Sequence, residues 1–111
     1  MATVTSTHPY PRSAALADRL HELVPGGGHT YSKGDDQFPQ RSPRLLTRAS
    51  GAYCWDADGN RFLDWAMGNR VFVLGHGHPA VNEAVKCQID IGLNFTRPGS
   101  LELELAEHLT G

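Results

Sequence analysis

The fold is decided by the stretch AYCWDADGNRFL, which spans residues 52–63. Its two ends, 52–55 and 61–63, are rich in residues that favour β-strands, and Asp, Asn and Gly residues with turn chemistry lie between them. The Asp58-Gly59 pair supplies the positive φ that a tight hairpin needs. Together with the β-forming run Leu45-Leu46-Thr47 upstream, the stretch predicts a small antiparallel meander.

A short helix is predicted ahead of this meander, over residues 13–24. Apolar residues recur there at three- and four-residue spacing and therefore share one helical face. Ser13 is expected to be the N-cap, and Pro25 followed by three glycines is expected to end the helix. Residues 29–43 are polar and interrupted by Pro and Gly, so we expect an ordered loop, a kind of segment that often carries function.

Helices are also predicted downstream of the meander. Pro79 suits the first turn of a helix, and Gly92 is placed to end it. The final segment from Ser100 is ambiguous, because residues 101–105 alternate like a strand whereas the leucines through Leu109 share a helical face. Acidic residues near its start favour a helix, which we therefore expect.

Composition limits the classes of function. The 111 residues include ten basic and twelve acidic ones, for a net charge of −2, and the basic residues form no stripe, so we expect no nucleic-acid partner. No apolar run approaches the roughly 18 residues of a membrane span, so no membrane role is expected. The two cysteines fit no disulfide framework or CxxC site, and residues 1–12 lack the apolar core of a secretory signal, which together favour the cytoplasm.

The histidines suggest a metal site only weakly. His29, His76 and His78 are possible ligands of a transition metal, but no third ligand stands at a defined spacing from the pair around Gly77. Hydrogen bonding within the turn is the favoured interpretation, and we expect no metal. The glycine run 26–28 lacks the phosphate-loop patterns, which leaves helix termination or close approach to a ligand as its role.

Four blocks then form a series: LVPGG at 23–27, the hairpin at 51–60, Leu63-Asp64, and LGHGHP at 74–79. In this order and spacing they resemble the N-terminal part of class III pyridoxal-phosphate-dependent aminotransferases, in the glutamate-1-semialdehyde 2,1-aminomutase-like branch. The resemblance implies the α/β type I fold of these transferases, of which this chain would be the N-terminal portion. Residues 1–12 would then be a flexible N-terminus, 13–70 the helix, substrate loop and small-domain meander, and 71–111 the start of a truncated large domain that binds the cofactor.

The resemblance also implies an activity, a cofactor and partners. Family members are homodimers that use pyridoxal phosphate (PLP) to transfer an amino group between a small-molecule amino donor and a carbonyl acceptor, through a Schiff-base lysine. Neither Lys33 nor Lys86 matches that position, so this chain alone is expected to be inactive and to contain no catalytic residue. Thr96 and Arg97 fall in a loop that lies near the cofactor and the dimer interface in the family, and no residue of this chain is predicted to bind the cofactor more specifically. The alternative is a non-catalytic binding or dimerisation module of the same fold.

The resemblance places four residues at the substrate site. Thr30 and Lys33 stand where the aminomutases carry a serine and an arginine, and Asn69 and Arg70 follow the hairpin where related enzymes line the pocket. A guanidinium offers a planar fork for a carboxylate, so Arg70 or Lys33 is expected to bind one on the substrate. The structural alternatives are that Arg70 pairs with Asp64 and that Asn69 caps a turn.

Overall fold

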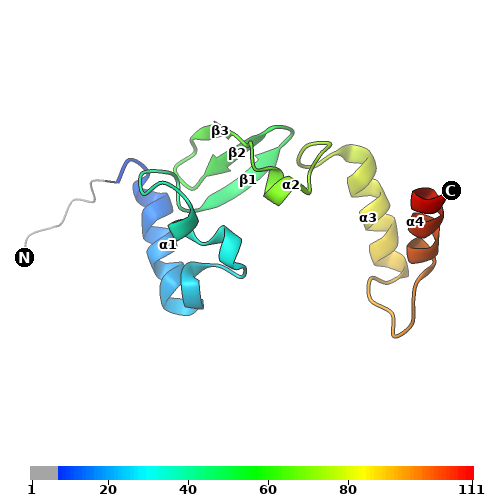
Figure 1. Cartoon of the computed structure of the whole chain (residues 1–111). Coiled ribbons are helices and arrows are strands. Elements are labelled where there is room, and N and C mark those ends of the chain that lie inside the picture. The colour runs from blue at the N-terminus through cyan, green and yellow to red at the C-terminus, as the bar shows by residue number, and fades with distance from the viewer. Residues whose placement is uncertain (1–7) are drawn as a thin grey trace, which may run out of the picture. The chain divides into compact units, whose positions relative to one another are not determined.

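The computed structural model describes residues 8–111, which divide along the chain into two compact units, one ending at His78 and the other beginning at Pro79. The first unit contains, in chain order, α1 (Pro11–Leu23), three short 3₁₀ turns (Pro25–Gly27, Tyr31–Lys33 and Asp35–Gln37), β1 (Leu46–Ser50), β2 (Tyr53–Asp56), β3 (Arg61–Leu63) and α2 (Met67–Arg70). The second contains α3 (Pro79–Ile91) and α4 (Ser100–Thr110) (Figure 1). The domain boundaries expected after residues 12 and 70 stay predictions, and residues 1–7 of the expected flexible N-terminus lie outside the described residues.

The predicted meander is confirmed as a three-stranded antiparallel sheet in the order β1-β2-β3. β1 begins later than predicted and runs on to Ser50, with a register irregularity between Leu46 and Arg48. Asp56 closes the β2–β3 hairpin, because its buried carboxylate accepts the backbone N–H groups of Asp58 and Asn60 at 3.0 and 2.8 Å. Gly59 has the positive φ, 88°, that its turn position predicted.

The start of α1 corrects the prediction for Ser13. The helix begins at Pro11, and the N–H groups of Arg12 and Ser13 donate to the carboxylate of Asp58 at 2.9 and 2.8 Å. Because this distant carboxylate satisfies the orphan donors of the first turn, Ser13 is not the N-cap. Its hydroxyl, fully buried, instead accepts the N–H of Leu45 at 2.7 Å and donates to the Leu45 carbonyl at 3.0 Å.

The apolar core of the first unit is small. Among residues 8–78, the buried apolar residues are Ala14 and Ala17 on α1 and Cys54 on β2, and burial raises the pKa of the Cys54 thiol. The Tyr10 ring meets the Phe62 ring edge-on with centroids 5.5 Å apart, which adds a contact between the start of α1 and β3. Polar contacts between distant segments therefore carry much of the connection between α1 and the sheet.

The second unit confirms both predicted helices. α3 begins at Pro79, and Gly92 follows it with φ 128°. The ambiguous final segment is helical, as expected from its acidic start, and Glu102 bonds back to Gly99 through its backbone N–H (3.2 Å) and its carboxylate (3.4 Å). None of the helices in residues 8–111 combines the length and apolar character that a membrane span needs.

Candidate functional site

The two segments predicted to bind substrate lie next to each other. The side-chain amide of Asn69 donates to the hydroxyl of Ser32 at 3.1 Å. Ser32 lies in the turn Tyr31–Lys33, between the predicted residues Thr30 and Lys33. The bond therefore brings the loop after the glycine run together with α2, and it gives Asn69 a partner in another loop.

The glycine run ends α1 and shapes a pocket. Gly26 and Gly27 have φ of 77° and 67°, a region that L side chains rarely adopt. A Cβ at Gly27 would lie 2.4 Å from the His21 ring, so only glycine fits there. A pocket of about 480 Å³ adjoins this turn, and its lining includes Gly26, Gly28 and Thr30. Of the four predicted substrate residues, only Thr30 lines it.

α2 is a left-handed turn, a feature that the sequence analysis missed. Its four residues have consecutive positive φ values: 44° at Met67, 60° at Gly68, 63° at Asn69 and 70° at Arg70. Left-handed geometry costs about 1–2 kcal/mol for each residue with a side chain, and such strain concentrates at functional sites. The Gly68-Asn69 pair was the available signal, because Gly and Asn tolerate this region best. Nothing at Met67 or Arg70 predicts it.

Asp64 starts this turn and pairs with His76. One carboxylate oxygen accepts the backbone N–H groups of Ala66 and Met67, both at 3.0 Å, and the other lies 2.7 Å from His76 Nε2. Burial would raise the pKa of Asp64, but the bonds from His76 and from these two amides outweigh it and hold that pKa below its ordinary value of 3.8. The alternative of an Arg70–Asp64 pair is therefore wrong.

The His76 side chain bonds outside its own turn, to a carboxylate twelve residues earlier, where the sequence predicted hydrogen bonding within the turn. Its partner is the Asp64 carboxylate, and both side chains are 13% exposed. Among residues 8–111 no group of three His, Cys, Asp or Glu side chains is placed to hold a metal ion. His78 is not drawn into this pair, and its Nδ1 is buried without a hydrogen-bond partner.

Lys33 and Arg70 are both exposed cations. Within the part of the chain that the structure describes, neither forms an ion pair with a carboxylate. Two uncommitted cations flank the Ser32–Asn69 contact in sequence, and an anionic group is the ligand that such a pair suits. Thr96 and Arg97, which the resemblance places in a loop near the cofactor and the dimer interface, lie in the second compact unit between α3 and α4, and both are exposed.

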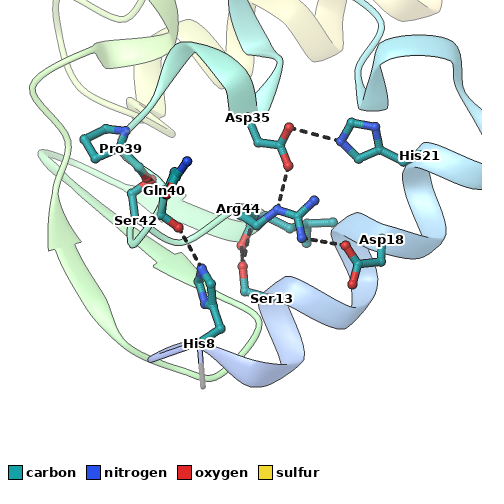
Figure 2. A network of polar contacts seen from close by, with 10 residues as sticks. His8, Ser13, Asp18, His21, Asp35, Pro39, Gln40, Ser42 and Arg44 are labelled. Atoms are coloured by element: carbon teal, nitrogen blue, oxygen red, sulfur yellow. Dashed lines mark hydrogen bonds and ion pairs between the residues drawn. The ribbon is translucent and has the colours of Figure 1, made fainter. Parts of the chain in front are cut away.

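A charged network holds the loop that carries Thr30 and Lys33 (Figure 2). Arg44 donates to Asp35 and to Asp18 on α1, each at 2.6 Å, and His21 Nε2 lies 3.0 Å from the other Asp35 oxygen. Burial would raise the pKa of Asp35, but the bonds from Arg44 and His21 prevail and lower it. Sequence reasoning missed this network because its members share no local spacing.

The chain is similar in sequence to known proteins of one family. The family described as Aminotransferase class-III matches residues 33–110. Glutamate-1-semialdehyde 2,1-aminomutase of Polaromonas naphthalenivorans is 42% identical over 98 residues, which are 88% of this chain and 22% of that protein. The chain thus spans under a quarter of this relative's length.

Solved structures give the same result. A glutamate-1-semialdehyde aminomutase from Pseudomonas aeruginosa PAO1 superposes with a TM-score of 0.76 at 29% identity, covering 90% of this chain and 22% of that one. The FumI protein of Sphingopyxis sp. MTA144, solved as its PLP internal aldimine, gives 0.74 at 28% identity, covering 87% and 23%. The helix, meander and following helices thus occur as one part of larger chains.

Proposed function

The chain belongs to the class-III aminotransferase family, and we propose that it forms the substrate-contacting N-terminal portion of a PLP-dependent aminotransferase or aminomutase. The full-length protein would transfer an amino group between an amino compound and a carbonyl acceptor, as a cytoplasmic homodimer. The observation that carries the proposal is the Ser32–Asn69 hydrogen bond, because it joins the two segments whose residues resemble the family's substrate site.

The proposed site binds substrate by charge and shape. The Arg70 guanidinium would take a carboxylate through two parallel N–H···O bonds, and the Lys33 ammonium would add a point charge nearby. Thr30 would donate or accept through its hydroxyl at the edge of the pocket beside the glycine run. Asn69, oriented by Ser32, fixes the spacing of the two loops. None of these residues is assigned a proton transfer.

The lysines of this chain do not fit covalent attachment of PLP. When bound, PLP supplies an electron sink for the charge left on a substrate carbon. A lysine that holds it must be desolvated enough to lose its proton, but Lys86 is 71% exposed and 3.9 Å from Glu83, and Lys33 is exposed. Covalent attachment of PLP therefore requires a lysine other than Lys33 and Lys86, and the role proposed for Thr96 and Arg97 is in the loop near the cofactor and the dimer interface.

A spectroscopic test addresses the lysines. Mixing the 111-residue chain with PLP is expected to give no stable band at about 400–430 nm, where an internal aldimine absorbs. The full-length protein is expected to show this band. A band from the chain that persists after gel filtration and disappears in Lys33→Ala would contradict the assignment.

A kinetic test addresses the substrate site. In the full-length protein, Arg70→Ala is expected to raise KM for a carboxylate-bearing amino donor by about 10- to 100-fold, the loss of a charge-assisted bond. KM for an amine without a carboxylate should stay unchanged. Arg41→Ala, an exposed arginine in the preceding loop, is the matched control. Equal KM values for wild type and Arg70→Ala with the carboxylate donor would disprove the role of Arg70.

The second candidate function, a dimerisation module, is favoured by one observation. α3 and α4 each carry a row of apolar side chains that are about half or more exposed: Val81, Val85, Ile89, Leu101, Leu105 and Leu109. Apolar surface of this kind is typical of interfaces. Sedimentation equilibrium of the chain tests this candidate, because a dimerisation module would self-associate without PLP and Val85→Lys would abolish the association; a monomeric chain would contradict it.

A further inference from the structure

Two side chains, those of Asp64 and Phe72, contact the left-handed turn α2, and both also contact His76. One carboxylate oxygen of Asp64 accepts the N–H groups of Ala66 and Met67, and the other is bonded to His76 Nε2 at 2.7 Å. These bonds fix the backbone at the point where it enters the left-handed turn. A change at His76 therefore frees the carboxylate that starts α2.

The second side chain that contacts α2 is Phe72, which follows the turn in the sequence. Its ring centroid lies 4.7 Å from that of His76. A Cβ at Gly68 would lie 2.6 Å from the Phe72 ring, so this ring also sits directly against the backbone of α2. The N–H of Phe72 donates to the Met67 carbonyl at 3.1 Å and closes the turn. The His76 ring thus supports the turn on its second side.

The backbone of His76 is bonded to Gly51, the residue that directly follows β1. Its backbone N–H and C=O exchange two hydrogen bonds with Gly51, both at 2.9 Å. The approach is so close that a Cβ at Gly75 would lie 3.1–3.2 Å from the Gly51 backbone. Gly75 also has φ 90°, which favours glycine. Gly51 and Gly75 therefore fix the position of the His76 backbone, from which the side chain reaches Asp64 and Phe72.

We propose that His76 is a positioning residue of the substrate site: acting through Asp64 and Phe72, it holds Met67–Arg70 in the left-handed turn that presents Asn69 and Arg70. This inference rests on the proposed function of Arg70 and extends it to a residue that contacts no substrate. The strained turn would otherwise relax, because right-handed backbone is favoured at Met67, Asn69 and Arg70. Relaxation would move the guanidinium away from its ligand.

Two variants of full-length protein test this proposal. His76→Leu removes the donor to Asp64, whereas His76→Gln retains an N–H donor at a similar reach. We expect His76→Leu to raise KM for the carboxylate donor by about tenfold, as expected for loss of one hydrogen bond to a charged group, with kcat and the KM of a plain amine nearly unchanged. His76→Gln should restore most of the KM. His78→Gln, in the same motif but outside the Asp64 pair, is the matched control.

Amide hydrogen exchange supplies a readout besides activity. The N–H groups of Arg70 and Phe72, bonded to Ala66 and Met67, should lose protection about tenfold or more in His76→Leu and little in His76→Gln. If His76→Leu does not fold, Phe72→Leu, at a half-exposed site, is expected to give the same loss in weaker form.

The outcomes separate the two proposals. Unchanged protection in His76→Leu, or in Phe72→Leu where that variant is needed, would overturn the positioning role. So would equal changes in KM for donors with and without a carboxylate. A third outcome is that His76→Leu loses protection while Arg70→Ala keeps a normal KM. That outcome would confirm that His76 stabilises α2 and would refute the function proposed for Arg70.

Discussion

The two compact units differ in the interactions that determine their structure: contacts between distant segments in the first, local sequence signals in the second. In residues 8–78, side chains from distant segments meet: Asp58 of the hairpin binds the first turn of α1, and the buried Ser13 hydroxyl binds Leu45. In Pro79–Gly111 no residue is buried, and the helices follow local signals such as Pro79 and Gly92. The first unit should therefore respond strongly to single substitutions at its long-range contacts, and the second only weakly.

The largest effect is expected at Ser13. Ser13→Ala leaves the N–H and C=O of Leu45 without their hydroxyl partner, which should cost about 2–3 kcal/mol of unfolding free energy. Urea unfolding followed by tryptophan fluorescence measures it, because Trp55 and Trp65 are the only tryptophans and both lie in the first unit. Ser50→Ala, at an exposed strand end, is the control. Equal losses in the two variants would break the comparison.

Ala17 and Ala84 form a matched pair across the two units. Ala17 on α1 is 3% exposed, so Ala17→Leu should overpack the small core and cost about 1–2 kcal/mol. Ala84 on α3 is exposed, and Ala84→Leu should stay within about 0.5 kcal/mol of wild type. Far-ultraviolet circular dichroism during urea unfolding follows both. A larger cost at Ala84 would show that a packed surface covers α3.

Asp58 tests the long-range cap of α1. Asp58→Ala removes the carboxylate that accepts the Arg12 and Ser13 N–H groups, and should cost about 1 kcal/mol, as for an N-cap. Asp90→Ala on the exposed surface of α3 is the control. If both variants unfold at the wild-type urea midpoint, the cap contributes nothing to stability.

The smallest effect is expected from pH. The pKa values of Asp35 and Asp64 are lowered in the folded chain. Their contribution to the free energy of unfolding is therefore full above the ordinary value of 3.8 and is lost as pH falls through the lowered values. Both residues lie in the first unit, whose fluorescence should therefore change first on acidification below about pH 4. Asp35→Asn should weaken this dependence, and Glu104→Gln on α4 should not. Identical acid titrations of wild type and Asp35→Asn would contradict it.

The regular elements were largely predictable because their signals are local. The three strands and the helices after Pro79 follow from β-forming runs, turn residues, and a proline and glycine that bound a helix. The ordered loop predicted for residues 29–43 is confirmed, with its 3₁₀ turns as added detail. The start of α1 was misplaced because its cap comes from Asp58, a residue that no local pattern connects to it.

The candidate site was only partly predictable. The sequence blocks selected Thr30, Lys33, Asn69 and Arg70 through a family resemblance, and their substrate role stays a proposal. The left-handed turn and its support by Asp64 and His76 could not be predicted, because positive φ at residues with side chains arises from contacts and not from propensity.

The sequence by itself determined the strands, the hairpin turn, the helices α1, α3 and α4 apart from the start of α1, and the family, because each depends on residue types at short, ordered spacing. Only the tertiary structure decided which donors and acceptors meet: Asp58 at the start of α1, Arg44 between Asp18 and Asp35, and His76 on Asp64. The physical reason is that most polar groups removed from water are hydrogen-bonded, and the folded chain brings their partners within reach from any part of the sequence. No local pattern in the sequence indicates which distant residue each partner is.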